Sequence, residues 1–306
     1  MAMEKRVVFK SAWLPYVLLL PQLTITALFF FWPAAQAVYF SFQLQDAFGM
    51  TSQFVWFDNY TYLFRDSHYL SSFKVTAFFS VMVASTGILI SLLLATMADS
   101  VVRGALAYKT FLIWPYAVAP AVAGVLWAFI FAPSIGIVTY FLKKFGIDWN
   151  WIINSEQAML LVVIASVWKQ ISYNFLFFLA GLQSIPKSLI EAAAIDGAGP
   201  FRRFWTIVFP LLSPTTFFLL VMNIIYSFFD TFGVIDATTQ GGPGDATKIL
   251  VYKVYYDGVK AADLGGSSAQ SVILMAIDSA MIRLFTSIVE TGAEEPFSDP
   301  AVSTWV

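Results

Sequence analysis

The sequence of 306 residues has no cysteine and one histidine, His68. The absence of cysteine excludes a disulfide framework and a thiolate nucleophile, and one histidine leaves almost nothing for a zinc site. Charged residues are scarce as well, at 12% of the chain, where soluble domains carry about 25%. The sequence also lacks the G-x-x-x-x-G-K-[ST] motif, so the chain is not a nucleotide-binding subunit of the P-loop type.

Apolar residues dominate what is present. They make up 59% of the chain, with 31 Phe and 10 Trp, and the mean hydropathy is +0.74. One globular core cannot hide so much apolar surface, which indicates that a bilayer is the solvent. The net charge of -2 comes without a basic patch, so we expect no nucleic-acid partner.

Apolar runs of membrane-crossing length recur along the chain. Five are clear, at 15–40, 73–98, 105–132, 157–182 and 207–229. They do not alternate polar and apolar residues as barrel strands do, so they must be helices. A sixth run, 270–289, is weaker because Asp278 and Arg283 interrupt it. We predict an all-α, polytopic transmembrane helical bundle of about six spans.

The chain divides around this bundle into a short amino end at 1–12, a transmembrane domain at 13–290 and an acidic tail at 291–306. The first run is too long for a cleaved signal peptide, so we expect a retained span. Lys5, Arg6 and Lys10 precede it and favour a cytoplasmic amino end, although Lys143 and Lys144 weaken the overall charge bias.

Two polar stretches fall on the predicted outer side. The stretch at 43–72 is too polar for lipid, and we expect short surface helices there. The loop at 230–268 contains Gly-Gly-Pro-Gly at 241–244, a strong turn signal.

A distinctive polar segment, 184–210, separates the fourth and fifth runs. It predicts two short helices with a break between them. Ser184 is the expected cap of the first helix, and Asp196-Gly197 is its expected stop. Pro200 is expected to start the second helix and Pro210 to end it.

This segment resembles the coupling loop of binding-protein-dependent ABC permeases. The matching residues are Glu191, Ala192, Ala193, Asp196, Gly197, Ile207 and Pro210. The resemblance implies that the first helix sits in a cleft of a separate ATPase subunit. The alternative is an ordinary interfacial amphipathic helix that caps the bundle.

The resemblance extends over about 10–274, to carbohydrate-type permeases. It is carried by Trp-Leu-Pro at 13–15, Phe-Phe-Trp-Pro at 30–33, Trp-Pro-Tyr-Ala-Val-Ala-Pro at 114–120 and Gly-Gly-Pro at 241–243. The stretches 166–178 and 228–232 are most similar to permeases of glycerol-3-phosphate importers. The carboxyl end departs from the family through Asp278, Arg283 and the acidic tail.

The resemblance implies a non-enzymatic transport subunit in a bacterial inner membrane. Its implied partners are a second homologous permease, an ATP-binding subunit dimer that holds ATP and Mg, a periplasmic or lipoprotein solute-binding protein, and membrane lipid. No cofactor is expected in this chain. The implied solute is sn-glycerol-3-phosphate or a glycerophosphodiester, with a sugar or another polyol as the alternative.

Candidate contacts along the solute path are polar residues within or next to the apolar runs: Lys169, Tyr173, Asn174, Tyr226 and Asp230. An intramembrane lysine is costly, so it normally faces a bundle interior, a carboxylate or a water-filled path. Lys169 could therefore meet a phosphate. It could equally pair structurally with Asp230 or extend to the surface.

Two other classes of protein stay open. An ion-coupled secondary transporter would place carboxylates or broken helices near the midplane, whereas the clear runs hold few acids and no matching interrupted pair. A membrane-embedded enzyme would need a nucleophile, an acid-base pair or a metal cluster, which this composition hardly offers.

Overall fold

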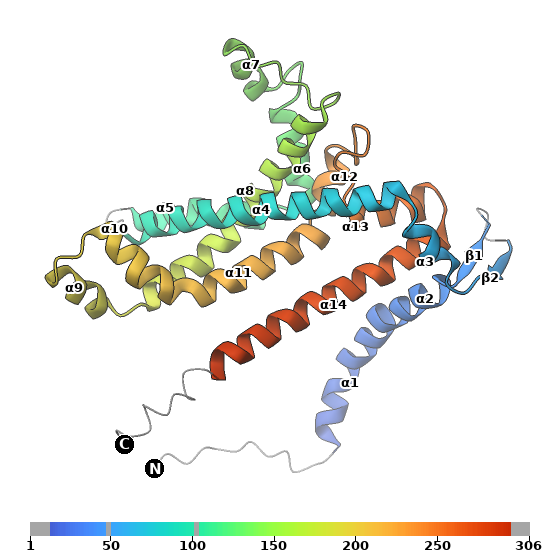
Figure 1. Cartoon of the computed structure of the whole chain (residues 1–306), viewed down its shortest axis with the longest axis horizontal. Helices are drawn as coiled ribbons and strands as arrows, with labels where there is room; N and C mark the ends of the chain where they lie inside the picture. The colour runs from blue at the N-terminus through green and yellow to red at the C-terminus, as the bar shows by residue number, and fades with distance from the viewer. Residues whose placement is uncertain (1–12, 47–49, 101–103, 295–306) are drawn as a thin grey trace.

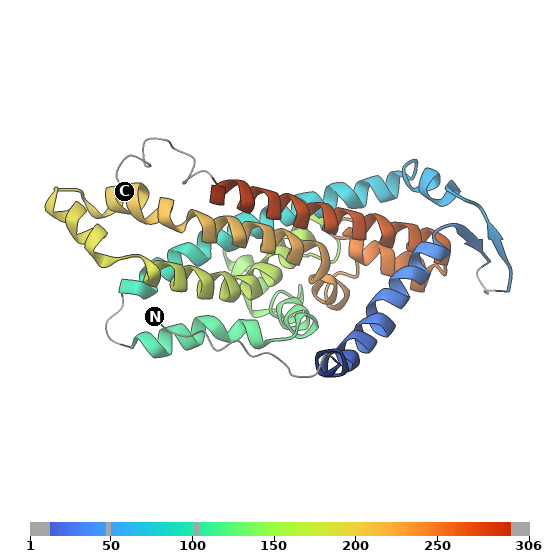
Figure 2. The ribbon, with the colours of Figure 1, turned by 90° about the horizontal axis from the view of Figure 1, so that it is seen from below.

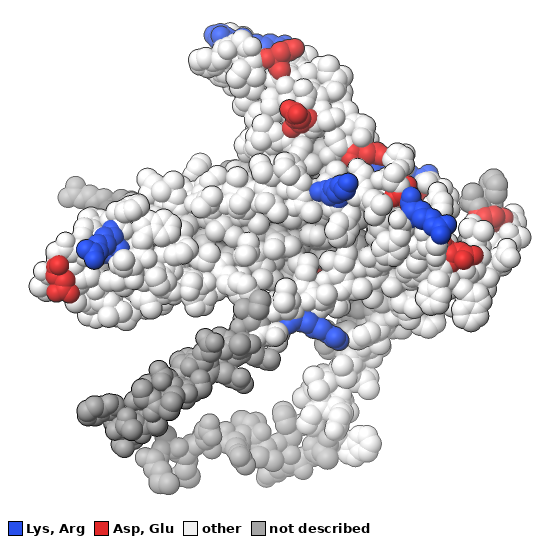
Figure 3. All heavy atoms as spheres, viewed as in Figure 1, with Lys and Arg blue, Asp and Glu red and all other residues white. Residues whose placement is uncertain are grey.

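The computed structural model describes residues 13–46, 50–100 and 104–294, and the predicted amino end at 1–12 and most of the acidic tail lie outside them. Five of the described helices are long and apolar enough to cross a membrane, and a bent helix pair makes a sixth candidate. Most charged side chains on the face in Figure 3 gather toward the ends of the molecule and on a projecting arm. The predicted helical membrane bundle is confirmed.

Three helices form the centre of the bundle: α4 (Ser67–Ser100), α8 (Ser155–Ser184) and α11 (Phe209–Phe229). Large side chains such as Phe79, Phe175 and Leu219 are fully buried between them. Asn154 starts α8 by accepting hydrogen bonds from the backbone amides of Glu156 and Gln157, at 3.0 and 3.2 Å.

A glycine sets the distance between two of these helices. A Cβ on Gly181 of α8 would lie 2.7 Å from Leu212 Cδ1 and 3.2 Å from Thr215 Oγ1 of α11. Any larger residue would require the Leu212 side chain to move, and small residues are common where membrane helices pack this closely.

The first span leaves the bundle (Figures 1 and 2). It consists of α1 (Leu14–Thr26), the π-helical turn η1 (Ala27–Phe31) and α2 (Trp32–Phe40), and none of its residues is buried. Its carboxyl end, α2, packs against α14 (Leu264–Glu294). A 27-residue apolar helix with no covered face needs lipid or another chain around it.

The third span is broken, and the prediction of one continuous helix at 105–132 is wrong. α5 (Ala105–Ile113) and the 3₁₀ turn η2 (Trp114–Ala117) meet α6 (Pro120–Ile130) at a bend of 103°. Pro120 has no amide hydrogen and forces Ala119 into an extended conformation, with ψ 143°. α6 and α7 (Ile137–Lys144) then project sideways as an arm (Figure 1).

The stretch at 43–72 differs in part from the prediction of surface helices alone. β1 (Gln43–Gln45) and β2 (Ser52–Phe54) pair antiparallel, and only then does α3 (Asp58–Leu63) follow. Asn59 fixes the hairpin by donating to the carbonyls of Ser41 and Gln43, at 2.8 and 2.9 Å. Backbone that lies outside the hydrocarbon can pair as strands, because it does not have to satisfy its hydrogen bonds within a helix.

The loop at 230–268 folds into α12 (Phe232–Ala237), α13 (Leu250–Tyr255) and the π-helical turn η4 (Tyr256–Lys260). Near its turn, Asp245 lies 2.6 Å from Lys248 Nζ and 3.3 Å from His68 Nδ1. Burial acts to raise the pKa of the Asp245 carboxyl, but Lys248 and then His68 together lower that pKa below its ordinary value. These contacts tie the loop to the start of α4.

The sixth span is confirmed as a helix of crossing length. α14 contains an apolar stretch from Leu264 to Ser287 and continues through Asp278 and Arg283. Arg283 is exposed and Asp278 is half-buried, so neither charge is enclosed in the protein core.

Candidate functional site

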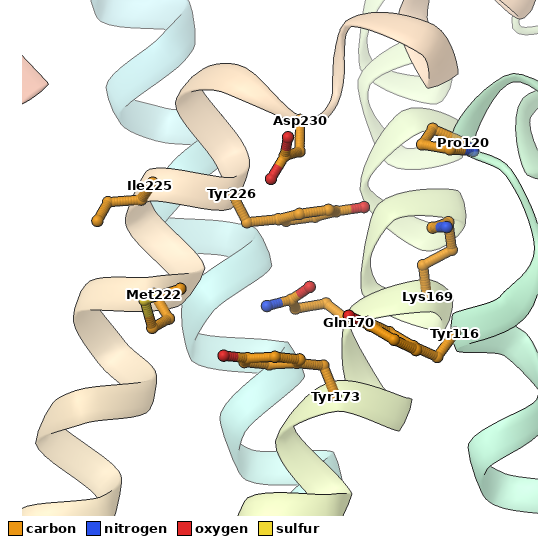
Figure 4. A pocket seen from close by; sticks show the side chains of 9 residues that line it. All are labelled: Tyr116, Pro120, Lys169, Gln170, Tyr173, Met222, Ile225, Tyr226 and Asp230. Carbon is orange, nitrogen blue, oxygen red and sulfur yellow. The ribbon is translucent and has the colours of Figure 1, made fainter. Parts of the chain in front are cut away.

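A cavity of about 500 Å³ opens between α8, α11 and the break in the third span (Figure 4). Its walls are mostly polar and aromatic: Tyr116, Pro120, Lys169, Gln170, Tyr173, Met222, Ile225, Tyr226 and Asp230. The structure thus brings four of the five predicted path residues to one place.

Lys169 reaches the broken span from α8. Its side chain is only 8% exposed, and its ammonium group donates to the carbonyl oxygen of Val118. Val118 is extended, so its carbonyl has no place in a helical ladder. No ion pair joins Lys169 to Asp230 among the described residues.

Aromatic rings cross the cavity. The side chains of Tyr173 and Tyr226 extend toward one another's helices, with Gln170 between them, and Asp230 hangs above Tyr226 (Figure 4). The ring centroids of Tyr116 and Tyr173 are 6.0 Å apart. Tyrosine offers both an apolar face and a hydroxyl, which suits a solute with carbon and oxygen surfaces.

Asn174 does not line the cavity. It is fully buried and exchanges two hydrogen bonds with Asn223 of α11, at 3.1 and 2.8 Å. Gly87 of α4 lies beside the pair. This arrangement joins three spans, which is the ordinary use of an amide inside a membrane bundle.

The sequence did not indicate Tyr116, Pro120, Met222 or Ile225 as cavity residues. Tyr116 and Pro120 come from the Trp-Pro-Tyr-Ala-Val-Ala-Pro stretch, whose two prolines were a signal of the break. Met222 lies three residues before Ile225 and four before Tyr226, spacings that ordinary helix packing also produces.

The cavity offers one cation, one carboxylate, one amide and three phenols. Among the described residues, no group of three His, Asp or Glu side chains could hold a metal ion. This set of groups suits the recognition of a polar solute through hydrogen bonds and charge.

The second region is the polar segment between α8 and α11, at one end of the molecule, opposite the hairpin (Figures 1 and 2). It contains α9 (Lys187–Ile195), a break at Asp196-Gly197 and α10 (Pro200–Arg203). Gly197 has φ 82°, a conformation that an L side chain rarely adopts. The two helices, the stop at Gly197 and the start at Pro200 agree with the prediction.

Two details of this segment were predicted wrongly. Ser184 does not cap α9, because its hydroxyl donates to the Gly181 carbonyl at 2.7 Å. Pro210 does not end the second helix, which runs on into the fifth span from Pro200 to Phe229. The π-helical turn η3 (Phe204–Val208) lies just before Pro210, a local adjustment of the kind by which helices absorb proline.

α9 is held out from the bundle and has no buried residue. Leu189, Ile195 and Phe201 are 46%, 87% and 78% exposed. Of the predicted coupling residues, Ala193 and Ile207 are half-buried, and the others are exposed: Glu191, Ala192, Asp196, Gly197 and Pro210. An exposed apolar patch at the end of a membrane bundle is typical of a protein interaction site.

A bundle with a polar cavity between its spans and a short helix presented at one end defines a membrane transport permease. The chain belongs to the family of binding-protein-dependent transport system inner membrane components, whose model matches residues 87–290. It is therefore a multi-pass membrane protein, as the resemblance in its sequence implied.

The chain is similar to curated relatives over most of its length. It is 61% identical over 269 residues to the "sn-glycerol-3-phosphate transport system permease protein UgpA" of Yersinia pseudotuberculosis serotype I (strain IP32953), covering 88% of this chain and 92% of that one. It is 59% identical over 286 residues to the protein of the same name from Brucella abortus biovar 1 (strain 9-941), covering 94% and 98%.

A solved structure shares the fold. A chain of a bacterial ABC transporter involved in the import of the acidic polysaccharide alginate superposes with a TM-score of 0.78 at 21% identity, covering 91% of this chain and 96% of that one. The same transporter with an alginate pentasaccharide-bound periplasmic protein gives a TM-score of 0.78 at 22% identity, covering 92% and 96%.

Proposed function

We propose that this chain is a permease subunit of an ATP-driven importer for sn-glycerol-3-phosphate or glycerophosphodiesters. The observation that carries the proposal is identity of 59% to 61% to permeases named for sn-glycerol-3-phosphate transport, over nearly their whole length. The cavity supports it because a buried lysine there faces carboxylate, amide and phenol groups.

The proposed solute matches the cavity group by group. Lys169 is the point charge for the phosphate, and a passing anion must be held weakly enough to leave. Asp230 and the tyrosines offer hydrogen bonds to the glycerol hydroxyls. Tyr173, Tyr226 and Asp230 therefore belong to the proposed solute path with Lys169. Asn174 does not, and instead holds α8 against α11 through its hydrogen bonds with Asn223.

The proposed complex contains four further components: a second homologous permease, two ATP-binding subunits and a periplasmic or lipoprotein solute-binding protein. The uncovered α1 supports a neighbouring membrane chain. The exposed α9 supports an ATPase neighbour, with Glu191 pairing a basic group there and Ala192 and Ala193 allowing close approach. ATP and Mg are then held by the partner, and this chain carries no cofactor.

The proposed orientation puts the amino end and α9 on the cytoplasmic side of a bacterial inner membrane. Lys and Arg near the amino end and in the segment around α9 support it through the positive-inside rule. The hairpin, α12 and α13 then face the solute-binding protein.

Reconstitution tests the proposal directly. The complete importer, purified with its partners into vesicles, is supplied with the solute-loaded binding protein and with ATP inside. We expect uptake of labelled sn-glycerol-3-phosphate that stops when ATP is omitted. Uptake driven by an ion gradient through this chain alone would refute the proposal, and ATP-driven uptake restricted to sugars or neutral polyols would replace its solute.

A further inference from the structure

A second, smaller cavity lies between the central helices and the segment 184–210, which we call the coupling segment. It has a volume of about 250 Å³ and separates α9 and α10 from the ends of α4 and α8. Its lining comes from all four helices, from η3 and from the residue that follows α8: Thr96, Asp99, Leu182, Ile185, Ile190, Pro200, Arg203, Phe204 and Val208.

Two opposite charges face this cavity without meeting. Asp99 comes from the end of α4 and Arg203 from the end of α10, and no ion pair within 4.0 Å includes either side chain among the described residues. The Nε atom of Arg203 is buried and has no acceptor. An unsatisfied donor on a charged group is costly, so its retention calls for an explanation.

The position of the cavity explains why the unsatisfied Arg203 donor is retained. The main packing partners of α9 are α10 and η3. Ile190, half-buried on the inner side of α9, faces the cavity. A force applied to α9 can therefore reach α4 directly by closing this space, in addition to passing through α8 and α11, which both pack on α4.

We propose that Asp99 and Arg203 are positioning residues that form an ion pair when the ATPase pushes the coupling segment against the bundle. The pair links α10 to α4 and so transmits the movement to the second span as well as to the fifth. This inference rests on the proposed coupling of α9 to an ATPase. The structure then represents the open state, in which the cavity separates the two charges.

Charge reversal tests the pair in the complete reconstituted importer. Asp99→Arg and Arg203→Asp are each expected to lower ATP-driven uptake about tenfold, within the usual range of coupling between sites. The double variant is expected to recover most of that loss, because it restores an opposite pair. Lys109→Asp, on α5 and not in the cavity lining, is the charge-matched control and is expected to keep wild-type uptake.

Co-purification of the ATPase is measured for every variant. Reduced uptake with the ATPase still bound, rescued in the double variant, supports the pair. Single variants without effect, or a double variant as impaired as the singles, overturn it. Loss of the proposed function is distinguishable, since the unaltered importer would then show no ATP-driven uptake.

Closure itself is measurable because the chain has no cysteine. Thr96→Cys on α4 and Ile190→Cys on α9 introduce two thiols on opposite walls of the cavity. Disulfide formation is expected to be faster with ATP and vanadate than without nucleotide. An equal rate in both conditions would overturn the closure.

Discussion

Lys169 is the residue on which solute selectivity depends most in the proposed mechanism. Lys169→Gln keeps a donor for the Val118 carbonyl but removes the charge. A hydrogen bond to a charged group is worth about 1.5–3 kcal/mol, so apparent affinity for sn-glycerol-3-phosphate is expected to fall about tenfold or more. The decrease for a neutral polyol is expected to be much smaller.

Concentration-dependent uptake in vesicles measures both values. Lys144→Gln, on the exposed face of α7, removes the same charge outside the cavity and is the control. Equal losses for the anionic and the neutral solute would assign Lys169 a structural role only.

Asn174 illustrates a residue whose role the sequence could not define. An amide inside a span fits both a solute contact and an interhelical bond, and only the position of Asn223 distinguishes them. Asn174→Leu leaves Asn223 buried without its partner and is expected to destabilise the bundle by about 1–2 kcal/mol.

Thermal unfolding in detergent measures the stability lost in Asn174→Leu. The double variant Asn174→Leu/Asn223→Leu is expected to recover part of that stability. A variant with normal stability but altered solute affinity would instead place Asn174 on the solute path.

At the scale of elements, crossing helices were predictable because length and composition alone define them in a bilayer. The two short helices at 184–210 and the break between them were also predictable, since Gly197 and Pro200 restrict the backbone locally. The roles expected of Ser184 and Pro210 were not met. The bend at Pro120 was not predictable, because proline inside a span is often absorbed without a break. Tyr116 and Pro120 reach the cavity through that bend, so the sequence did not place these two lining residues there.

The turn at Gly197, after α9, is expected to be required for ATP-driven uptake. Gly197→Asp places a charged side chain in a left-handed conformation, which Asp adopts less readily than Gly, and alters the turn after α9. ATP-driven uptake is expected to be lost while membrane insertion is retained, and Glu191→Lys is expected to act alike. Membrane fractionation and uptake are the two measurements.

Gly146→Asp is the matched control, because Gly146 has φ 77°, has open space around it and lies after α7. Normal uptake by both Gly197→Asp and Glu191→Lys would remove the segment from coupling.

At the scale of the molecule, the uncovered first span shows that the chain does not form a closed unit. α1 buries none of its residues, although it is among the most apolar parts of the chain. Expression with the second permease is expected to raise the yield of monodisperse protein in detergent well above that of the chain alone. Gel filtration measures this, and equal yields would indicate that lipid alone covers α1.

The close approach of α8 and α11 at Gly181 divides α8 into two unequal lengths. Along α8, Lys169 lies about 18 Å from that glycine, whereas Ile185, where the coupling segment begins, lies about 6 Å away on the other side. If α8 tilts as a rigid rod about this point, a small displacement at Ile185 becomes one about three times larger at Lys169, beside the cavity. The place of Gly181 along α8 therefore decides how far the cavity end of the helix moves for a given displacement at its other end.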